Sequence, residues 1–429
     1  MRAEDQRQEH TSSYYAASVT EKTNYPVLQG EHNADICVVG GGFTGVATAL
    51  TLAERGYDVA LVEANRIGWG ATGRNGGQII NGMSGLAKIE AKYGDSVAET
   101  VRGLRWRGND IIRERVARYN IDCDLKDGFV EVAAKPNQVA YVEEYAAERQ
   151  AHDTGHKWEV WNREETCAKL GTDAFHGAFA CYRDGHVHPL NLCIGEARAA
   201  AGLGVRIFEQ SPVTGIDHGD RPRVKTTQGH VDAKSVVLAG NAYSQFEPKH
   251  LSNLVFPAGS YIIATEPLEE EVTQKINPLD VAVCDLNEVV DYYRLSADKR
   301  LLYGGACNYS GRDPASIKAY ILPRLKRVYP QLKDVRIEYE WGGKIGIVLR
   351  RIPTVGRIHG NVYYCQGYSG HGVCATHVMG EVMADAVSGT MERFDLFADM
   401  KHFRIPGSQW FGNQIIALGM LYYKLQDKL

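Results

Sequence analysis

Two kinds of pattern are missing from this sequence. Its nine cysteines are scattered and odd in number, and no two of them stand in C-x-x-C spacing. This arrangement argues against a structural zinc site and a redox-active disulfide, and it predicts reduced thiols in a cytoplasmic compartment. No window is apolar over the roughly 18 residues that a membrane span requires, and the polar, charged start of the chain does not resemble a secretory signal. We therefore expect a cytoplasmic protein without a metal site or a transmembrane span.

An excess of charge of one sign is also missing. The 429 residues carry a net charge of −4, which gives no electrostatic reason to expect a nucleic-acid partner. The most basic stretch, residues 101–120, repeats arginine at roughly helical spacing. We interpret it as a helix with Arg102, Arg105 and Arg113 turned to solvent rather than as a phosphate-binding patch. With 44% hydrophobic and 23% charged residues, the chain is long enough for two domains with separate cores.

Glycine is abundant, and its first cluster follows a short apolar run. Gly40, Gly42 and Gly45 fit G-x-G-x-x-G directly after residues 36–39, which read as a buried parallel strand. The next helix begins near Phe43 and Thr44, so its unpaired amides would face a pyrophosphate. A second strand over residues 59–62 ends at Glu63, whose carboxylate can accept hydrogen bonds from ribose hydroxyls. The pattern predicts an ADP-containing dinucleotide, FAD or NAD, over the alternative of a glycine-rich turn without a ligand.

A second glycine cluster directly follows Glu63. It places glycines at 68, 70, 73, 76 and 77, too many for a packed helix or a simple turn. Thr72, Arg74, Asn75 and Gln78 add hydrogen-bond donors suited to ribityl hydroxyls, a pyrophosphate and ring carbonyls. A loop of this composition favours a large planar ligand, and so a flavin, over a flexible surface loop.

A third glycine cluster lies far downstream. Residues 362–365 read as a strand, Gly367, Gly370 and Gly372 as a loop, and residues 373–387 as a helix whose N-terminus faces that loop. A helix N-terminus aimed at the N1/C2 carbonyl edge of a flavin stabilises the negative charge of its reduced form. His371 is our candidate for a further donor at that edge. The alternative is a loop histidine that bonds only to backbone.

Together these motifs resemble a known family. The segments VVGGGFTG, GWGATGRNGGQ, VVLAGNAYS, YYRLSADKRLLYGG, RIPTVG and GYSGHG look like the FAD-dependent oxidoreductases of the D-amino-acid-oxidase superfamily. Within it the chain is most similar to the γ-glutamylputrescine oxidases of bacterial polyamine catabolism, through SSYYAAS, DGHVHPLNL and LGMLYYKLQDKL. The likeness covers nearly the whole chain.

The resemblance implies an α/β fold in which a doubly wound FAD-binding domain is interleaved with an α+β substrate domain built on a mixed sheet. The implied parts are a loosely packed N-terminal arm (1–30), an FAD-binding domain (31–88, 150–245 and 343–400), a substrate domain (89–149 and 246–342) and a C-terminal amphipathic helix (401–429). Besides the residues named above, the implied FAD contacts are Ala71, Gly76, Gly77, Val213, Ala239, Gly240, Gly343 and Val373. His188 stands where the family often has Asp, so no role is transferred to it, and Pro189 fits the first turn of a helix.

The absence of a second dinucleotide motif and of an arginine at one position narrows the possible electron donors and substrates. Only one G-x-G-x-x-G, at residues 40–45, stands between an expected strand and an expected helix, so a separate NADPH domain has no obvious place, and electrons should enter from an organic substrate and leave to dioxygen or a small carrier. Relatives that take α-amino acids often carry an Arg clamp after a Trp-Gly-Gly turn, where this chain has Lys344 and Ile345, followed later by Arg350 and Arg351. The missing clamp favours an amine held in an apolar channel. The resemblance implies that this amine is γ-glutamylputrescine or a related γ-glutamyl polyamine.

For that reaction we expect hydride transfer from the amine-bearing carbon to flavin N5, giving an imine that hydrolyses to an aldehyde, with dioxygen reduced to hydrogen peroxide. Lys344 is a candidate for helping dioxygen accept electrons, unless it is solvated or paired with Glu340. Tyrosines on the expected strands are candidate walls of the channel, although strand tyrosines more often serve packing. These tyrosines are Tyr261, Tyr292, Tyr293, Tyr303 and Tyr309.

Three alternatives stay open from the sequence. One is a D-amino-acid or sarcosine-like secondary-amine dehydrogenase that uses a quinone or another carrier. Another is a flavin-free dinucleotide-binding protein. The third concerns the C-terminal apolar stripe, which either docks on the chain itself or a second subunit, or makes a peripheral membrane contact. Its members are Trp410, Phe411, Ile415, Leu418, Leu421, Tyr422 and Leu425.

Overall fold

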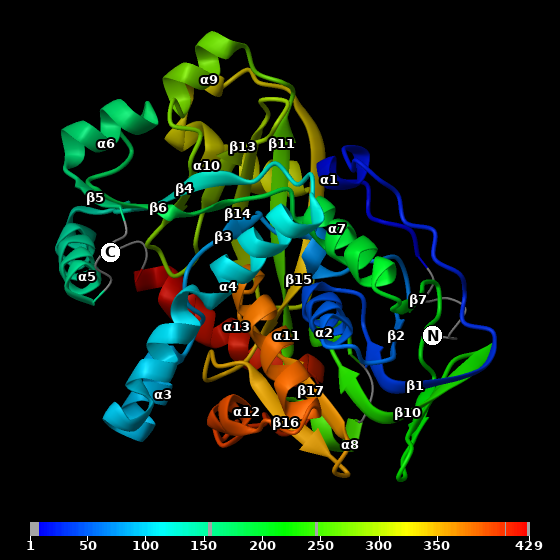
Figure 1. Ribbon diagram of the computed structural model, residues 1–429. Helices are drawn as coiled ribbons and strands as arrows, with labels where there is room; N and C mark the ends of the chain where they lie inside the picture. The colour runs from blue at the N-terminus through cyan, green and yellow to red at the C-terminus, as the bar shows by residue number, and fades with distance from the viewer. Residues whose placement is uncertain (1–7, 153–156, 245–247, 408, 427–429) are drawn as a thin grey trace.

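Two sheets organise the computed structural model, which describes residues 8–152, 157–244, 248–407 and 409–426 (Figure 1). The eight-stranded sheet has the order β16-β17-β10-β1-β2-β7, with β9 paired to β10 and β8 to β9. Its pairs β17-β10, β10-β1, β1-β2 and β2-β7 are parallel. The strands are β1 (Gly30–Val39), β2 (Val59–Val62), β7 (Arg206–Phe208), β8 (Gly215–Asp217), β9 (Arg223–Lys225), β10 (Gly229–Leu238), β16 (Thr354–Ile358) and β17 (Val362–Gln366).

The nine-stranded sheet is mixed and mostly antiparallel. Its order is β15-β11-β14-β13-β12-β4-β6-β3, with β5 paired to β6, and its parallel pair is β4-β12. The strands are β3 (Gln78–Ile79), β4 (Lys126–Val132), β5 (Trp158–Trp161), β6 (Ala178–His186), β11 (Phe256–Thr265), β12 (Ala282–Asp285), β13 (Tyr292–Leu295), β14 (Leu301–Asn308) and β15 (Ile337–Ile347). A doubly wound parallel sheet with a mixed second sheet is the fold class that the sequence predicted, and the prediction is confirmed.

Helices cover both sheets. Figure 1 shows α2, α4, α7 and α11 gathered between the two sheets, while α10 lies on the far side of the nine-stranded sheet. The helices are α1 (Tyr14–Ala17), α2 (Phe43–Glu54), α3 (Leu86–Tyr93), α4 (Ala98–Tyr119), α5 (Val139–His152), α6 (Arg163–Leu170), α7 (Pro189–Gly202), α8 (Pro248–Leu251), α9 (Glu270–Ile276), α10 (Ile317–Val328), α11 (Val373–Val387), α12 (Glu392–Ala398) and α13 (Gln409–Gln426). Short 3₁₀ turns are η2 (Ala71–Arg74), η3 (Gly94–Val97), η4 (Pro136–Gln138), η5 (Asn241–Tyr243) and η6 (Pro330–Leu332).

A buried ion-pair network joins three of these helices. Glu196 of α7 is fully buried, and it lies 3.0 Å from Arg115 of α4 and 3.1 Å from His377 of α11. Burial raises the pKa of the Glu196 carboxyl, but His377 and Arg115 outweigh burial and hold that pKa below its usual value. The network fixes how α11 lies against α4 and α7, and therefore where the loop before α11 is placed.

The chain divides differently from the predicted boundaries. β5 and β6 lie in the range predicted for the FAD-binding domain, yet they pair within the nine-stranded sheet. Helix α4 lies in the range predicted for the substrate domain, but much of its length packs with α2, α7 and α11 in the larger core. A helix with two apolar faces can pack against the core of either domain, and its sequence alone does not indicate which core it joins.

The N-terminal arm is packed, contrary to the expectation of a loose segment. Tyr15 is fully buried, with its ring 5.2 Å from that of Trp341, and Leu28 is also fully buried. The Tyr14 hydroxyl donates to Asp298 at 2.7 Å. The aromatic pair anchors the arm on the nine-stranded sheet, and residues 1–7 lie outside the described part of the chain.

Helix α13 docks through the face opposite the predicted stripe. Asn413 is buried and donates to the Pro257 carbonyl at 3.3 Å, while Trp410 and Leu418 are 62% and 67% exposed. Phe411 and Ile415 are exposed as well, and the side chains of Leu421, Tyr422 and Leu425 lie outside the described part. Among the described residues, no helix is long and apolar enough to cross a membrane.

Candidate active site

The first glycine loop has the close packing that a dinucleotide cradle requires. Gly40 has φ +114°, and a Cβ there would lie 2.9 Å from the Ala239 carbonyl oxygen, so Ala239 and Gly240 border this turn. A Cβ at Gly45 would overlap the Gly40 carbonyl. The first helical hydrogen bond of α2 runs from the Val46 amide to the Gly42 carbonyl at 2.9 Å, so the preceding amides point out of the helix end. An anion is the natural partner of such a helix end.

Glu63 lies at the end of β2, beside this loop. Its two carboxylate oxygens accept from the Gly41 amide at 2.5 Å and the Asn65 amide at 2.8 Å, which leaves lone pairs for further donors such as ribose hydroxyls. Burial raises the pKa of the Glu63 carboxyl, although these amide hydrogen bonds oppose the shift. The Glu63 carbonyl accepts from Ser211 at 2.9 Å, and this contact brings the segment with the buried Val213 to the same strand end.

The side chains of the second glycine loop mostly hold the loop itself. Arg74 donates from Nε to the Trp69 carbonyl at 2.9 Å and stacks over the Trp69 ring at 4.4 Å. Asn75 donates to the Thr72 carbonyl at 2.7 Å and accepts from Gly77 at 2.7 Å. The prediction gave these two side chains to the cofactor. The structure commits them to internal hydrogen bonds, so the loop presents mainly its backbone, including Ala71 at the start of η2.

Thr72 and Gln78 of this loop keep capacity for a ligand. The Thr72 hydroxyl oxygen accepts from the Phe43 amide at 3.0 Å and so links the loop to the start of α2, while its hydroxyl proton is left to donate. Gln78 Nε2 is buried and has no hydrogen-bond partner among the described residues. A buried amide donor without a partner costs free energy unless a ligand satisfies it.

The third glycine loop meets the first one. The Tyr368 hydroxyl lies 2.7 Å from Thr44 Oγ1, and the Gly367 amide donates to Asn241 at 2.9 Å. Helix α11 then begins at Val373, directly after Gly370 and Gly372, and a Cβ at Gly380 would lie 2.7 Å from the Ala47 Cβ. Three glycine loops that are distant along the chain therefore converge around the N-terminus of α2, as predicted.

His371 sits in the third loop with its Nε2 buried and unpartnered among the described residues. Burial lowers the pKa of His371, and hydrogen bonding to the backbone of Asn81 and Ile80 opposes the shift. A histidine in this state is neutral near pH 7. Its Nε2 can offer one further hydrogen bond to a ligand, while its backbone contacts match the alternative interpretation, so its role stays a prediction.

One face of the nine-stranded sheet lies over the glycine loops. Tyr292 of β13 is on this face, because a Cβ at Gly76 would lie 2.7 Å from its ring. The Tyr292 hydroxyl lies 3.3 Å from the Ser260 hydroxyl on β11. Ser260 pairs with Gly343 of β15, and a Cβ at Gly343 would lie 3.1 Å from the Arg74 Cβ. We call this side, which carries Tyr292 and Ser260, the loop face.

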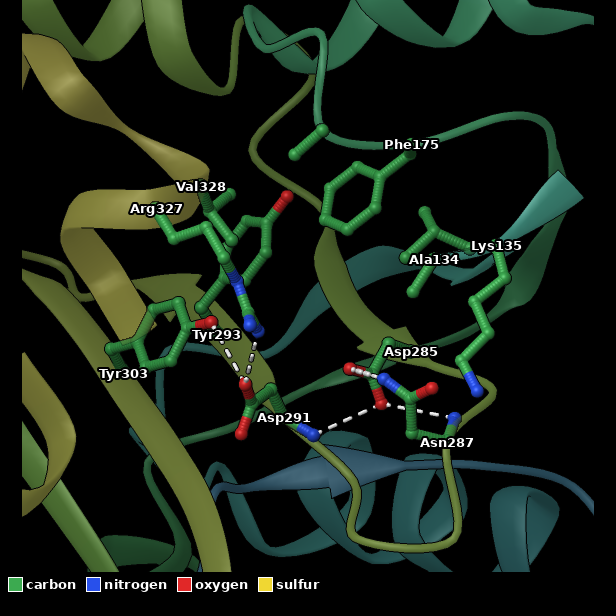
Figure 2. Close-up of a pocket in the computed structure, with 12 residues that line it drawn as sticks. Ala134, Lys135, Phe175, Asp285, Asn287, Asp291, Tyr293, Tyr303, Arg327 and Val328 are labelled. Atoms are coloured by element: carbon green, nitrogen blue, oxygen red, sulfur yellow. Dashed lines mark hydrogen bonds and ion pairs between the residues drawn. The ribbon is translucent and has the colours of Figure 1, made fainter. Parts of the chain in front are cut away.

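The three tyrosines predicted to bind substrate lie on the opposite face. Tyr261, Tyr293 and Tyr303 are buried in the core beneath α10. Tyr261 donates to Asp313 at 2.9 Å, and the rings of Tyr293 and Tyr303 stack 5.7 Å apart. A cavity of about 340 Å³ lies on that side. Tyr293 and Tyr303 line it together with Asp285 and Asp291 (Figure 2). This corrects the prediction: successive strand residues point to opposite faces, so Tyr292 faces the loops while Tyr293 does not.

By the same alternation along β15, the Lys344 side chain points away from the glycine loops. Gly343 and Ile345 are on the loop face, and Ile345 Cδ1 would lie 3.5 Å from a Cβ at Gly370. Lys344 points the other way and is exposed, and its amide donates to the Tyr243 hydroxyl at 3.1 Å. The suggested catalytic role of Lys344 beside the ring therefore finds no support in its position. Arg350 donates to the Lys401 carbonyl at 2.9 Å, so it does not replace the missing clamp.

Two positions on and beside the loop face were not predicted. Arg294 of β13 is 1% exposed, and it donates from Nε to Gly76 at 2.8 Å and from Nη2 to Val187 at 2.9 Å, which pins the second glycine loop to the sheet. His188 accepts from the Asn191 amide at 3.1 Å and caps α7, with Pro189 in the first turn as expected. The only signal for Arg294 was its place in the YYRLS motif, which does not reveal its partners.

The residues present fit a bound FAD. The cradle offers the N-terminus of α2 for the pyrophosphate, Glu63 for a ribose, and the unpartnered nitrogens of Gln78 and His371 for ring carbonyls. Fold and site thus define a flavin-binding oxidoreductase. The chain belongs to the FAD-dependent oxidoreductase family abbreviated DAO, whose model matches residues 35–386.

Particular relatives are similar over nearly the full length. The chain is 43% identical over 425 residues to the gamma-glutamylputrescine oxidoreductase of Escherichia coli, covering 98% of this chain and 99% of that protein. It is 37% identical over 427 residues to the probable oxidoreductase OrdL of Haemophilus influenzae, with 98% of each chain covered. Among solved structures, glycine oxidase from Geobacillus kaustophilus has a TM-score of 0.72 and 21% identity, covering 88% of this chain and 100% of that one. That likeness supports the fold alone.

Proposed function

We propose that this chain is an FAD-dependent amine oxidase that acts on γ-glutamylputrescine or a related γ-glutamyl polyamine. The observation that carries the proposal is the 43% identity to gamma-glutamylputrescine oxidoreductase over nearly the whole of both chains. The site supports it, because β15 has Lys344 and Ile345, and no arginine, directly after the Trp-Gly-Gly turn. A substrate without a carboxylate beside its reacting carbon does not need an arginine there to bind that carboxylate through two hydrogen bonds.

When bound, FAD supplies the hydride acceptor: the amine-bearing C–H bond breaks, its hydride goes to the flavin, and the resulting imine is hydrolysed to an aldehyde and ammonia. The chain's own residues orient and enclose the substrate. Tyr292 and Ser260 form part of the wall over the loops, and Arg294 holds Gly76 in place against that wall. Neutral His371 offers a hydrogen bond at the edge of the cradle. Dioxygen is the proposed electron acceptor and hydrogen peroxide the proposed product.

The test is anaerobic mixing of the holoenzyme with a panel of γ-glutamylputrescine, putrescine, sarcosine and D-alanine, followed by the loss of the flavin band at about 450 nm. γ-Glutamylputrescine should bleach the flavin fastest. Readmission of air should then restore the band and release one hydrogen peroxide per aldehyde. Faster bleaching by sarcosine or D-alanine would replace the proposed substrate. Slow recovery in air, with fast recovery on adding a quinone, would replace the proposed acceptor.

A further inference from the structure

One row of side chains crosses the loop face from Tyr292 to the far end of the sheet. Cys284 of β12 pairs with Tyr292 of β13, and Glu131 of β4 pairs with Cys284. Paired residues share a face, so Glu131 lies two strands from Tyr292, or roughly 10 Å at the usual strand spacing. On the other side of Glu131 is Phe179 of β6, whose ring packs with Tyr145 of α5 at 5.2 Å.

The Glu131 carboxyl is partly buried. Within the described part of the chain, no hydrogen bond or ion pair reaches it. Burial raises the pKa of Glu131 to about 7, and the charge of Asp184 adds to the shift. Burial raises the pKa of the Tyr141 and Tyr145 hydroxyls on α5, and the charge of Glu131 adds to both shifts. A carboxylate among aromatic rings is a suitable partner for an ammonium group.

A buried arginine nitrogen without a hydrogen-bond partner lies on the helix that covers this part of the sheet. Arg105 of α4 has its Nη1 buried without a hydrogen-bond partner among the described residues. Its carbonyl accepts from the Gly82 amide at 2.6 Å, which sets α4 beside the segment that follows β3 and Gln78 (Figure 1). Asp184 fixes that segment, because it accepts from Asn81 Nδ2 at 2.7 Å. The sequence had placed Arg105 on a solvated face, but the structure half-buries it over the sheet.

Arg105 and Glu131 border one aromatic cluster. Trp106, the chain neighbour of Arg105, and Phe179, which pairs with Glu131, pack in this cluster together with Tyr145. Burial raises the pKa of the Tyr145 hydroxyl; the charge of Glu131 adds to that shift and Arg105 opposes it. Neither is paired with the other, so a carboxylate and an ammonium group of one ligand can each find a partner here. From the oxidised carbon to the α-carbon of its glutamyl group, extended γ-glutamylputrescine spans about 10 Å at about 1.2 Å per bond. That span matches the separation of Glu131 from Tyr292.

On this basis, and resting on the proposed function, we propose that Arg105 and Glu131 select the substrate by binding the α-carboxylate and the α-ammonium of its glutamyl group. The reacting amine then lies beside Tyr292, with the alkyl chain along the row that Cys284 completes. The carboxylate of the substrate is thus bound at the end of the molecule that is distant from the reacting carbon.

The experiment compares holoenzyme variants on three substrates: γ-glutamylputrescine, N-glutarylputrescine, which lacks the α-amino group, and N-(4-aminobutanoyl)putrescine, which lacks the α-carboxylate. Arg105→Gln should lower kcat/KM about 10- to 100-fold for the two substrates with a carboxylate and leave the third unchanged. Glu131→Gln should do the same for the two substrates with an α-ammonium and leave N-glutarylputrescine unchanged. The matched controls are Arg102→Gln on α4 and Glu143→Gln on α5, both exposed, which should behave like wild type.

The outcomes separate this inference from the proposed function. If wild type fails to oxidise γ-glutamylputrescine, the proposed function is overturned. Suppose that wild type oxidises γ-glutamylputrescine, and that both variants keep the wild-type ratios of kcat/KM among the three substrates, with normal FAD content and melting temperature. The proposed roles of Arg105 and Glu131 are then refuted, while the proposed function stands. An equal loss on all three substrates, at normal FAD content, would also refute it, since that pattern indicates a general packing role.

Discussion

The strongest test of the site comes from two adjacent tyrosines on β13. Tyr292 faces the glycine loops, with its hydroxyl 3.3 Å from Ser260, and Tyr293 faces the core under α10, where its hydroxyl has no partner among the described residues. Tyr292→Phe removes a neutral hydrogen bond worth about 0.5–1.5 kcal/mol. If that bond orients the wall of the substrate channel, kcat/KM should fall about 2- to 10-fold. Tyr293→Phe removes a hydroxyl that lies on the α10 side of the sheet, away from the loops, so its kcat/KM should equal that of wild type.

The assay is steady-state amine oxidation with γ-glutamylputrescine, with FAD content measured by absorbance and stability by thermal melting. Both variants should keep one FAD per chain, because neither hydroxyl belongs to the cradle. The reasoning is refuted if Tyr293→Phe loses activity and Tyr292→Phe does not, since the substrate would then lie on the α10 side of the sheet, in the cavity of Figure 2.

Three further predictions follow from the cradle, the helix network and the chemistry. Thr72→Val removes the oxygen that accepts from the Phe43 amide and the proton left for a phosphate, so FAD should bind about 10-fold or more weakly in a titration of apoprotein, whereas Thr72→Ser should bind normally. Glu196→Gln strands the buried charge of Arg115 and should cost about 3–5 kcal/mol of unfolding free energy in urea at pH 7. Because the folded pKa of Glu196 is held low, its stabilisation is present above the ordinary carboxyl pKa and is lost as pH falls, so the gap to wild type should narrow in acid; a constant gap would contradict this. The rate of anaerobic flavin reduction should rise with pH toward the pKa of the bound amine, because a C–H bond beside an ammonium resists hydride loss, and a flat profile would count against the chemistry.

Local patterns predicted the cradle well. Residues 59–62 and 373–387 were expected as a strand and a helix, and they are β2 and α11. The ordered set of three glycine loops correctly indicated FAD, since each loop has its own requirement for bare backbone at a fixed place between a strand and a helix.

The substrate side was harder, for a definite reason. Alternation along a strand shows that Tyr292 and Tyr293 point to opposite faces, but only the pairing of β13 with β12 and β14 and the docking of α10 decide which face meets the loops. The same ambiguity applies to Lys344, which was a candidate beside the ring although Ile345 is the residue on the loop face. Arg105 and Glu131 are more than twenty residues apart on different elements, and nothing local to either predicts that both border the same aromatic cluster.

The most direct measurement is a crystal structure of the holoenzyme with a substrate analogue in which the oxidised amine is replaced by an unreactive group. Our account predicts the flavin ring between the three glycine loops and the loop face, with the analogue beside Tyr292 and Ser260 and its glutamyl end toward Arg105 and Glu131. An analogue bound on the α10 side, against Tyr293 and Tyr303, would contradict it.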